Sequence, residues 1–200
     1  MSFPAELAIA SRNRGKILEI QRVCANWPVR WVTALEDDGG WPDVDETGET
    51  YLENALLKAR AVAEALKVPC IADDSGLEVD SLGGAPGTRS ARYAGEDASD
   101  ADNIRKLVDA VADVPEEART ARFRCIAVAA WPDGPEVHAE ATYEGKIILE
   151  GRGTGGFGYD PVFIPDDGGG LTAAELADGK DAFSHRGRAF RALRDQVEKS

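Results

Sequence analysis

The stretch from residue 49 to residue 74 constrains the fold most, because a long helical pattern there leads directly into a short apolar run. Residues 49–67 place their apolar side chains on one helical stripe: Leu52, Leu56, Ala59, Val62, Ala63 and Leu66. Pro69 follows, as expected just past a helix end. Residues 70–72 then predict a short buried strand that ends in two adjacent acids, Asp73 and Asp74. Carboxylates are costly beside a dry strand, so a function is expected for them.

The segments before this stretch also alternate between strand and helix. Apolar runs predict strands over 7–10 and 29–33, with a helix over 17–27 between them. Residues 11–16 form the first connecting turn, and 36–48 form an acidic loop rich in turn-forming residues.

The second half of the chain predicts a hairpin flanked by helices. After a loop over 77–97, the helices are expected following Ser99 as an N-cap, following Thr172 with Glu175 at capping-box spacing, and over 187–199. The strands are expected over 121–131, 137–145 and 146–150, the first two joined by the turn 132–136.

These elements predict one α/β domain around a mixed sheet with flanking helices. No repeat, low-complexity tail or change in composition divides residues 1–200 into separable domains. The hairpin and residues 77–115 would form a second lobe within that domain.

Charge and cysteine content exclude several classes of protein. The net charge of −13 argues against a protein that grips the DNA or RNA backbone, so no nucleic-acid partner is expected. Three widely spaced cysteines without C-x-x-C spacing predict buried thiols rather than disulfides or a zinc site. The N-terminus lacks a signal-peptide pattern, and the longest strongly apolar run, 126–131, is too short to span a bilayer. We therefore expect a cytoplasmic protein with no membrane partner.

The paired acids indicate a magnesium site. Adjacent strand residues point to opposite faces, so Asp73 and Asp74 should not both serve one site. Mg²⁺ takes one or two carboxylates and fills its other positions with water and phosphate oxygens. A carboxylate from Asp45 or Glu46, in the loop before the helix, would meet Asp74 there. Acids at a helix start are also favoured by the helix dipole, which explains Glu49.

Two turns carry residues suited to an anionic or flat ligand. The turn SRNRGK over 11–16 lies between a strand and a helix, where backbone N–H groups collect phosphate, although a solvated basic turn fits it equally well. The glycines of 151–160 satisfy the spacing G-x-G-x-x-G. In the dinucleotide-binding motif this spacing leads directly into a helix, and Pro161 stands too close behind the glycines for a helix to begin there. Two interpretations of this segment remain. It is either a loop in which Phe157 and Tyr159 could stack on a flat ligand, or simply a long turn.

A local basic cluster lies near the C-terminus of this acidic chain. It consists of Lys180, His185, Arg186 and Arg188. Ser184 beside His185 does not make a hydrolase triad, because sequence-adjacent residues lack the triad geometry. Recognition of a planar, oxygen-rich group by charged donors is the better interpretation.

Together these motifs resemble one family along nearly the whole chain. Five segments in the same order, 11–16, 45–59, 71–96, 153–163 and 183–189, are similar to the inosine/xanthosine triphosphate pyrophosphatases. The resemblance implies an elongated α/β fold of two lobes around a central mixed sheet, with the active-site cleft between the lobes, and a homodimer. It also implies Mg²⁺-dependent hydrolysis of non-canonical purine nucleoside triphosphates (ITP, dITP, XTP) to the monophosphate and pyrophosphate.

The same resemblance assigns roles by position. Asp74 would be the general base and a metal ligand, with Asp45 or Glu46 as the other metal-binding acid. The expected substrate-binding residues are Ser11, Arg12, Asn13, Arg14, Gly15 and Lys16 for the triphosphate, Ser75 as a further contact, and Phe157, Gly158, Tyr159, Asp160, Lys180, His185 and Arg186 for the base.

Two departures from the family pattern leave alternatives open. Arg12 stands where the phosphate turn usually has glycine, so it either crowds the turn or adds a phosphate contact. At the position of Asp45 the family commonly has the longer Glu, which leaves open whether Asp45 or Glu46 reaches the metal. The rival functions are a pyrophosphatase for other modified nucleotides and a catalytically silent nucleotide-binding regulator.

Overall fold

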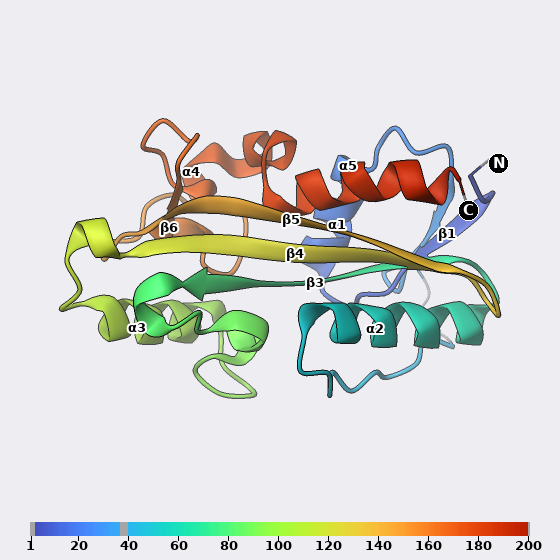
Figure 1. Ribbon diagram of the computed structural model, residues 1–200, viewed down its shortest axis with the longest axis horizontal. Helices are drawn as coiled ribbons and strands as arrows, with labels where there is room; N and C mark the ends of the chain where they lie inside the picture. The colour runs from blue at the N-terminus through green and yellow to red at the C-terminus, as the bar shows by residue number, and fades with distance from the viewer. Residues whose placement is uncertain (1–2, 37–39, 200) are drawn as a thin grey trace. The chain divides into compact units, whose positions relative to one another are not determined.

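The computed structural model describes residues 3–36 and 40–199, and its six strands form one sheet (Figure 1). The spatial order is β2-β1-β3-β4-β5-β6, and the strands are β1 (Glu6–Ile9), β2 (Arg30–Val32), β3 (Cys70–Val79), β4 (Thr120–Ala130), β5 (Glu136–Ile147) and β6 (Phe163–Pro165). Strand β1 pairs parallel with β2 and β3, whereas β5 and β6 are antiparallel. The predicted α/β fold with a mixed sheet is confirmed.

The α-helices of the described residues begin at capping side chains in most cases. They are α1 (Arg14–Val23), α2 (Tyr51–Leu66), α3 (Asp100–Val111), α4 (Ala173–Leu176) and α5 (His185–Val197). Capping boxes start α2 at Thr50, α3 at Ser99 and α4 at Thr172. The predicted caps Ser99 and Thr172 are therefore confirmed, and α2 begins just after the predicted Glu49.

Several predicted boundaries are wrong. Helix α1 starts at Arg14, because the side chain of Asn13 accepts the N–H of Lys16 at 3.0 Å. Half of the predicted turn over 11–16 is therefore the first turn of a helix. Residues 146–150 are not a separate strand, because β5 simply continues to Ile147. The short strand β6 was not predicted. The acidic loop expected over 36–48 lies partly outside the described residues.

Strand β3 differs most from its prediction. It runs for 10 residues, so Asp73, Asp74, Ser75 and Gly76 lie inside the strand and not at its end. Ser-Gly favours a turn in isolation, but β3 continues beside β4 beyond Cys70 and Ile71, where β1 pairs with it, and this sheet pairing overrides the local preference.

Contacts divide the chain into two compact units. The first takes its described residues from 1–74, 125–141 and 186–200, and the second from 75–124 and 142–185. Strands β3, β4 and β5 each contribute residues to both units. No helix of the described residues is long and apolar enough to cross a membrane.

In the first unit, helices cover both faces of the sheet (Figure 1). Helices α1 and α5 pack on one face, where the strands supply Leu7, Ile9, Ile71, Cys125, Ala127 and Ala129. Helix α2 packs on the other face, against Ala8, Ala10, Cys70, Ala72, Ile126, Val128 and Ala130. The strict alternation along β1, β3 and β4 follows from the two-residue repeat of a strand.

The second unit has its own apolar core. Leu107 and Val111 of α3 pack with side chains of β3, β4, β5 and β6, together with Tyr159 and Ala173. The helix that was predicted after Ser99 therefore faces this core with Leu107 and Val111.

Candidate active site

The loop between β1 and α1 forms a compact turn that is held by its own side chains. The N–H of Asn13 donates to Oγ of Ser11 at 3.1 Å, and Asn13 in turn caps α1. The guanidinium of Arg12 donates to the carbonyl of Trp41 at 3.0 Å and lies 3.2 Å from Asp43. The turn therefore accommodates Arg12, and Asn13 still caps α1. A helix start with a lysine in its first turn can bind an anion.

Asp73 lies on the α1 and α5 face of the sheet within a group of buried charges. Its Oδ2 accepts from Nε and Nη2 of Arg186 at 3.2 and 3.1 Å, and Nζ of Lys16 is 3.5 Å away. On its other side, Arg186 lies 3.0 Å from Oε2 of Glu19. Burial raises the pKa of Asp73, but the charges of Lys16 and Arg186 outweigh it, so the pKa lies below the ordinary value.

Asp74 lies on the opposite face, where α2 packs. Nδ2 of Asn54 is 3.4 Å from its Oδ2, and Nζ of Lys58 is 3.4 Å from its Oδ1. Burial raises the pKa of Asp74, and the opposing charges of Lys58 and Lys16 do not cancel this effect. The two acids therefore have separate partners, as their strand positions require.

Glu46 shares the ammonium of Lys58 with Asp74. Oε1 of Glu46 lies 2.9 Å from Nζ of Lys58, whereas Asp45 is exposed. Burial lowers the pKa of Lys58, but Asp74 and Glu46 raise it more, so the net shift is upward. Among the described residues, no group of three or more His, Cys, Asp or Glu side chains is arranged to hold a metal. The carboxylates of Asp74 and Glu46, which meet at the ammonium of Lys58, are nevertheless a donor set that suits Mg²⁺.

The glycine loop closes on Asp160 in the second unit. Gly156 has φ +71°, and a Cβ there would fall 1.9 Å from Oδ2 of Asp160, so only glycine fits. The same oxygen accepts the N–H of Phe157 at 3.1 Å and lies 3.1 Å from Nζ of Lys180. That ammonium also lies 5.7 Å from the centroid of the Phe157 ring. Lys180, Phe157 and Asp160 are therefore brought together, and no dinucleotide-binding helix follows the loop.

Three other residues that were predicted for base recognition, Gly158, Tyr159 and His185, lie in the same unit but make different contacts. The hydroxyl of Tyr159 donates to the carbonyl of Ser90 at 2.8 Å, and the N–H of Gly158 donates to Asp100 at 2.8 Å. His185 is 5% exposed and stacks on Phe123 at 4.9 Å between ring centroids. Arg186 differs, because it belongs to the first unit and pairs there with Glu19 and Asp73.

Sequence reasoning missed the polar side chains that hold the acids. Asn54 and Lys58 stand four residues apart on α2, beside the apolar stripe, and both contact Asp74. Glu19 is 1% exposed in α1. Because Asn54 and Lys58 stand beside the stripe and not on it, the apolar pattern gave no signal for them. Ser75 is half-buried in β3.

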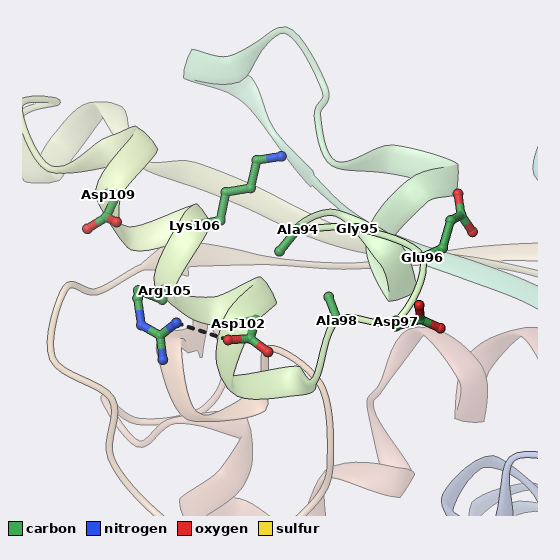
Figure 2. A pocket seen from close by; sticks show the side chains of 9 residues that line it. All are labelled: Ala94, Gly95, Glu96, Asp97, Ala98, Asp102, Arg105, Lys106 and Asp109. Carbon is green, nitrogen blue, oxygen red and sulfur yellow. Dashed lines mark hydrogen bonds and ion pairs between the residues drawn. The ribbon is translucent and has the colours of Figure 1, made fainter.

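A separate hollow of about 610 Å³ lies between α3 and the loop before it (Figure 2). Its cations are Arg105, which pairs with Asp102 at 2.9 Å, and Lys106, which donates to the carbonyl of Tyr93 at 2.6 Å. Carboxylates outnumber these cations along its lining, so the hollow does not suit a polyphosphate. None of the site residues predicted from the sequence lines it.

Comparison with known proteins gives one consistent family. The model of the Ham1 family matches residues 7–196. The chain is 51% identical over 195 residues to the dITP/XTP pyrophosphatase of Geobacillus kaustophilus, covering 96% of this chain and 94% of the relative. It is 45% identical over 196 residues to the dITP/XTP pyrophosphatase of Escherichia coli strain K12, covering 96% and 98%.

Solved structures agree with this result. The HAM1 protein from Coxiella burnetii superposes with a TM-score of 0.85 at 37% identity, covering 98% of this chain and 100% of that one. The dITP/XTP pyrophosphatase from Mycobacterium abscessus superposes with a TM-score of 0.73 at 42% identity, covering 94% and 97%.

Proposed function

Because this chain belongs to the Ham1 family, we propose that it acts as a dITP/XTP pyrophosphatase. It hydrolyses non-canonical purine nucleoside triphosphates to the nucleoside monophosphate and pyrophosphate. One observation carries the assignment of chemistry to residues: the first turn of α1 and the paired acids of β3 are brought together. Lys16 lies 3.5 Å from Asp73 and its charge acts on Asp74 as well.

The first unit would bind the triphosphate and hold the metal. Ser11, Asn13 and Lys16, with the N–H groups at the start of α1, offer donors to phosphate oxygens. Asp74 and Glu46 would hold Mg²⁺, with Asp45 as the alternative ligand. A bound Mg²⁺ would neutralise phosphate charge and favour attack by water on the α-phosphate.

Asp74 is the proposed general base. Its pKa is raised by burial, which makes the carboxylate a better proton acceptor than an exposed Asp. Lys58 and Asn54 fix the two carboxylate oxygens, so the side chain is oriented before substrate arrives.

The second unit would recognise the base. The Phe157 ring offers a stacking surface, and Lys180, held by Asp160, offers a charged donor to the O6 acceptor of hypoxanthine or xanthine. Adenine presents an amino group at that position, which leaves the donor unpaired. We also propose, on the resemblance alone, that Ser75 and His185 contact substrate and that the chain acts as a cytoplasmic homodimer.

The test is pyrophosphate release from dITP, XTP, dGTP and dATP with Mg²⁺, repeated with EDTA. We expect fast release from dITP and XTP, slow release from the other two, and none in EDTA. Equal rates on all four substrates would contradict the proposed selectivity. Orthophosphate as the first product would indicate a γ-phosphatase instead.

A further inference from the structure

We propose that Asn54 is a positioning residue of the metal site, which ties the loop carrying Asp45 and Glu46 to Asp74. The inference rests on the proposed function and deepens it, because it names the side chain that sets the distance between the metal-binding acids. In this role Asn54 contacts neither the metal nor the substrate. Three observations within the first unit carry the inference.

The first observation is that one buried amide contacts both segments. Asn54 lies in α2 and is 2% exposed. Its Oδ1 accepts the backbone N–H of Gly48 at 2.8 Å, and its Nδ2 lies 3.4 Å from Oδ2 of Asp74. A backbone N–H can only donate and a carboxylate can only accept, so an amide, which does both, suits the position between them. Asn54 therefore links the end of the acidic loop to the proposed general base.

The second observation is that Gly48 is fitted to this contact. A Cβ on Gly48 would fall 2.7 Å from Oδ1 of Asn54 and 2.6 Å from Cβ of Glu53, closer than van der Waals contact allows. Gly48 does not have a positive φ, so its backbone conformation is open to other residues. The close approach to α2 is therefore what requires glycine at this position.

The third observation is that two neighbouring side chains of α2 hold the loop for different purposes. Glu53 accepts the N–H groups of Glu49 and Thr50 at 2.8 and 2.9 Å, as part of the capping box that starts α2. Glu53 is exposed, whereas Asn54 is buried beside Asp74. Glu53 thus stabilises the start of the helix, and Asn54 sets where the loop lies relative to the acid on β3.

This link would prepare the acids for the metal before it binds. Glu46 and Asp74 repel each other, and Lys58 offsets their charges from between them. Without Asn54, the loop carrying Asp45 and Glu46 would be free to move away from Asp74. A metal would then have to bring the loop back, and that ordering would reduce its affinity.

Two measurements made without nucleotide test this inference. Amide hydrogen exchange followed by NMR reports whether the N–H of Gly48 is protected. Binding of Mn²⁺ followed by electron paramagnetic resonance reports the affinity of the acids for a metal that prefers the same oxygen ligands as Mg²⁺. The variants are Asn54→Ala, Gly48→Ala and Glu53→Ala. Glu53→Ala is the matched control, because it releases other N–H groups of the same segment and leaves Asn54 in place.

We expect Asn54→Ala to raise the dissociation constant of Mn²⁺ about tenfold, because one hydrogen bond to a buried or charged group is worth about that factor. The N–H of Gly48 should lose its protection, while those of Glu49 and Thr50 should keep theirs. Gly48→Ala should weaken Mn²⁺ binding by a similar factor. Glu53→Ala should lower the thermal unfolding midpoint, because the capping box is lost, but change Mn²⁺ affinity by less than about threefold.

Several results would overturn the inference. Wild-type Mn²⁺ affinity in Asn54→Ala, or a protected Gly48 N–H in that variant, would show that the loop is held elsewhere. Equal weakening in Glu53→Ala would assign the position of the loop to the capping box, and no Mn²⁺ binding by the wild type would contradict a prepared site. If Asn54→Ala does not fold, Gly48→Ala decides, and wild-type affinity there would count against the inference. Failure of the proposed function is seen separately, as absence of pyrophosphate release from dITP by the wild type.

Discussion

The ammonium of Lys58 lies 3.4 Å from Oδ1 of Asp74, on the face of β3 that α2 covers. The same ammonium is 2.9 Å from Glu46, so two carboxylates depend on one largely buried cation. Replacing Lys58 with Met leaves these carboxylates facing each other, and we expect the free energy of unfolding in EDTA to fall by about 3 kcal/mol. Mg²⁺ should recover much of this loss, because it would supply the missing positive charge.

Thermal unfolding with and without Mg²⁺ measures the effect. Lys67→Met serves as the control, because Lys67 pairs with Glu64 on the exposed end of the same helix. Stabilisation by Mg²⁺ that is no larger in Lys58→Met than in the wild type would show that the ion binds elsewhere.

Asp74→Asn should remove most of the turnover and leave the fold intact. The amide is nearly the same size as the carboxylate but cannot take a proton, and loss of a general base typically costs about 10²- to 10⁴-fold in rate. Pyrophosphate release from dITP gives the rate, and circular dichroism reports the fold. Asp109→Asn, at an exposed carboxylate of α3, should behave as the wild type. Near-normal kcat in Asp74→Asn would assign the proton to another group.

Glu46→Gln should raise the Mg²⁺ concentration needed for half-maximal activity more than Asp45→Asn does. Glu46 and Asp74 both contact the ammonium of Lys58, whereas Asp45 is exposed. A Mg²⁺ titration of the two variants side by side makes the comparison. The opposite order would identify Asp45 as the ligand, as the family pattern suggests.

Lys180→Met should narrow the preference for dITP over dATP, whereas Phe157→Ala should weaken all purine substrates alike. An unpaired buried donor costs about 1–3 kcal/mol, which corresponds to roughly ten- to a hundredfold discrimination. Stacking does not depend on which purine is bound. The ratio of kcat/KM values for dITP and dATP is the measurement. An unchanged ratio in Lys180→Met would place base recognition elsewhere.

The three thiols should not react with a thiol reagent in the folded protein. Cys24, Cys70 and Cys125 are buried and free, and burial raises the pKa of each above its ordinary value. Reaction with dithionitrobenzoate should therefore appear only after unfolding in guanidinium chloride, and then with all three thiols. A fast-reacting thiol under native conditions would contradict the observed burial.

The sequence by itself determined the elements whose signals are local. Thr50, Ser99 and Thr172 cap helices through their own side chains, and the apolar stripe of 49–67 needs only a sheet to face. The opposite orientation of Asp73 and Asp74 was likewise predictable, because the two-residue repeat holds in any strand. The order of the five motifs sufficed to indicate the family.

Only the tertiary structure decided which charges meet. The length of β3 depends on its neighbouring strands, so Ser75 and Gly76 extend a strand that their local preference would end. Arg186 stands beside His185 in the sequence, yet its guanidinium contacts Asp73, 113 positions away, and Glu19. Lys58 and Asn54 contact Asp74 because α2 packs on that face of the sheet. Such pairings depend on how helices lie on the sheet, and desolvation makes each one strong enough to fix a side chain's role.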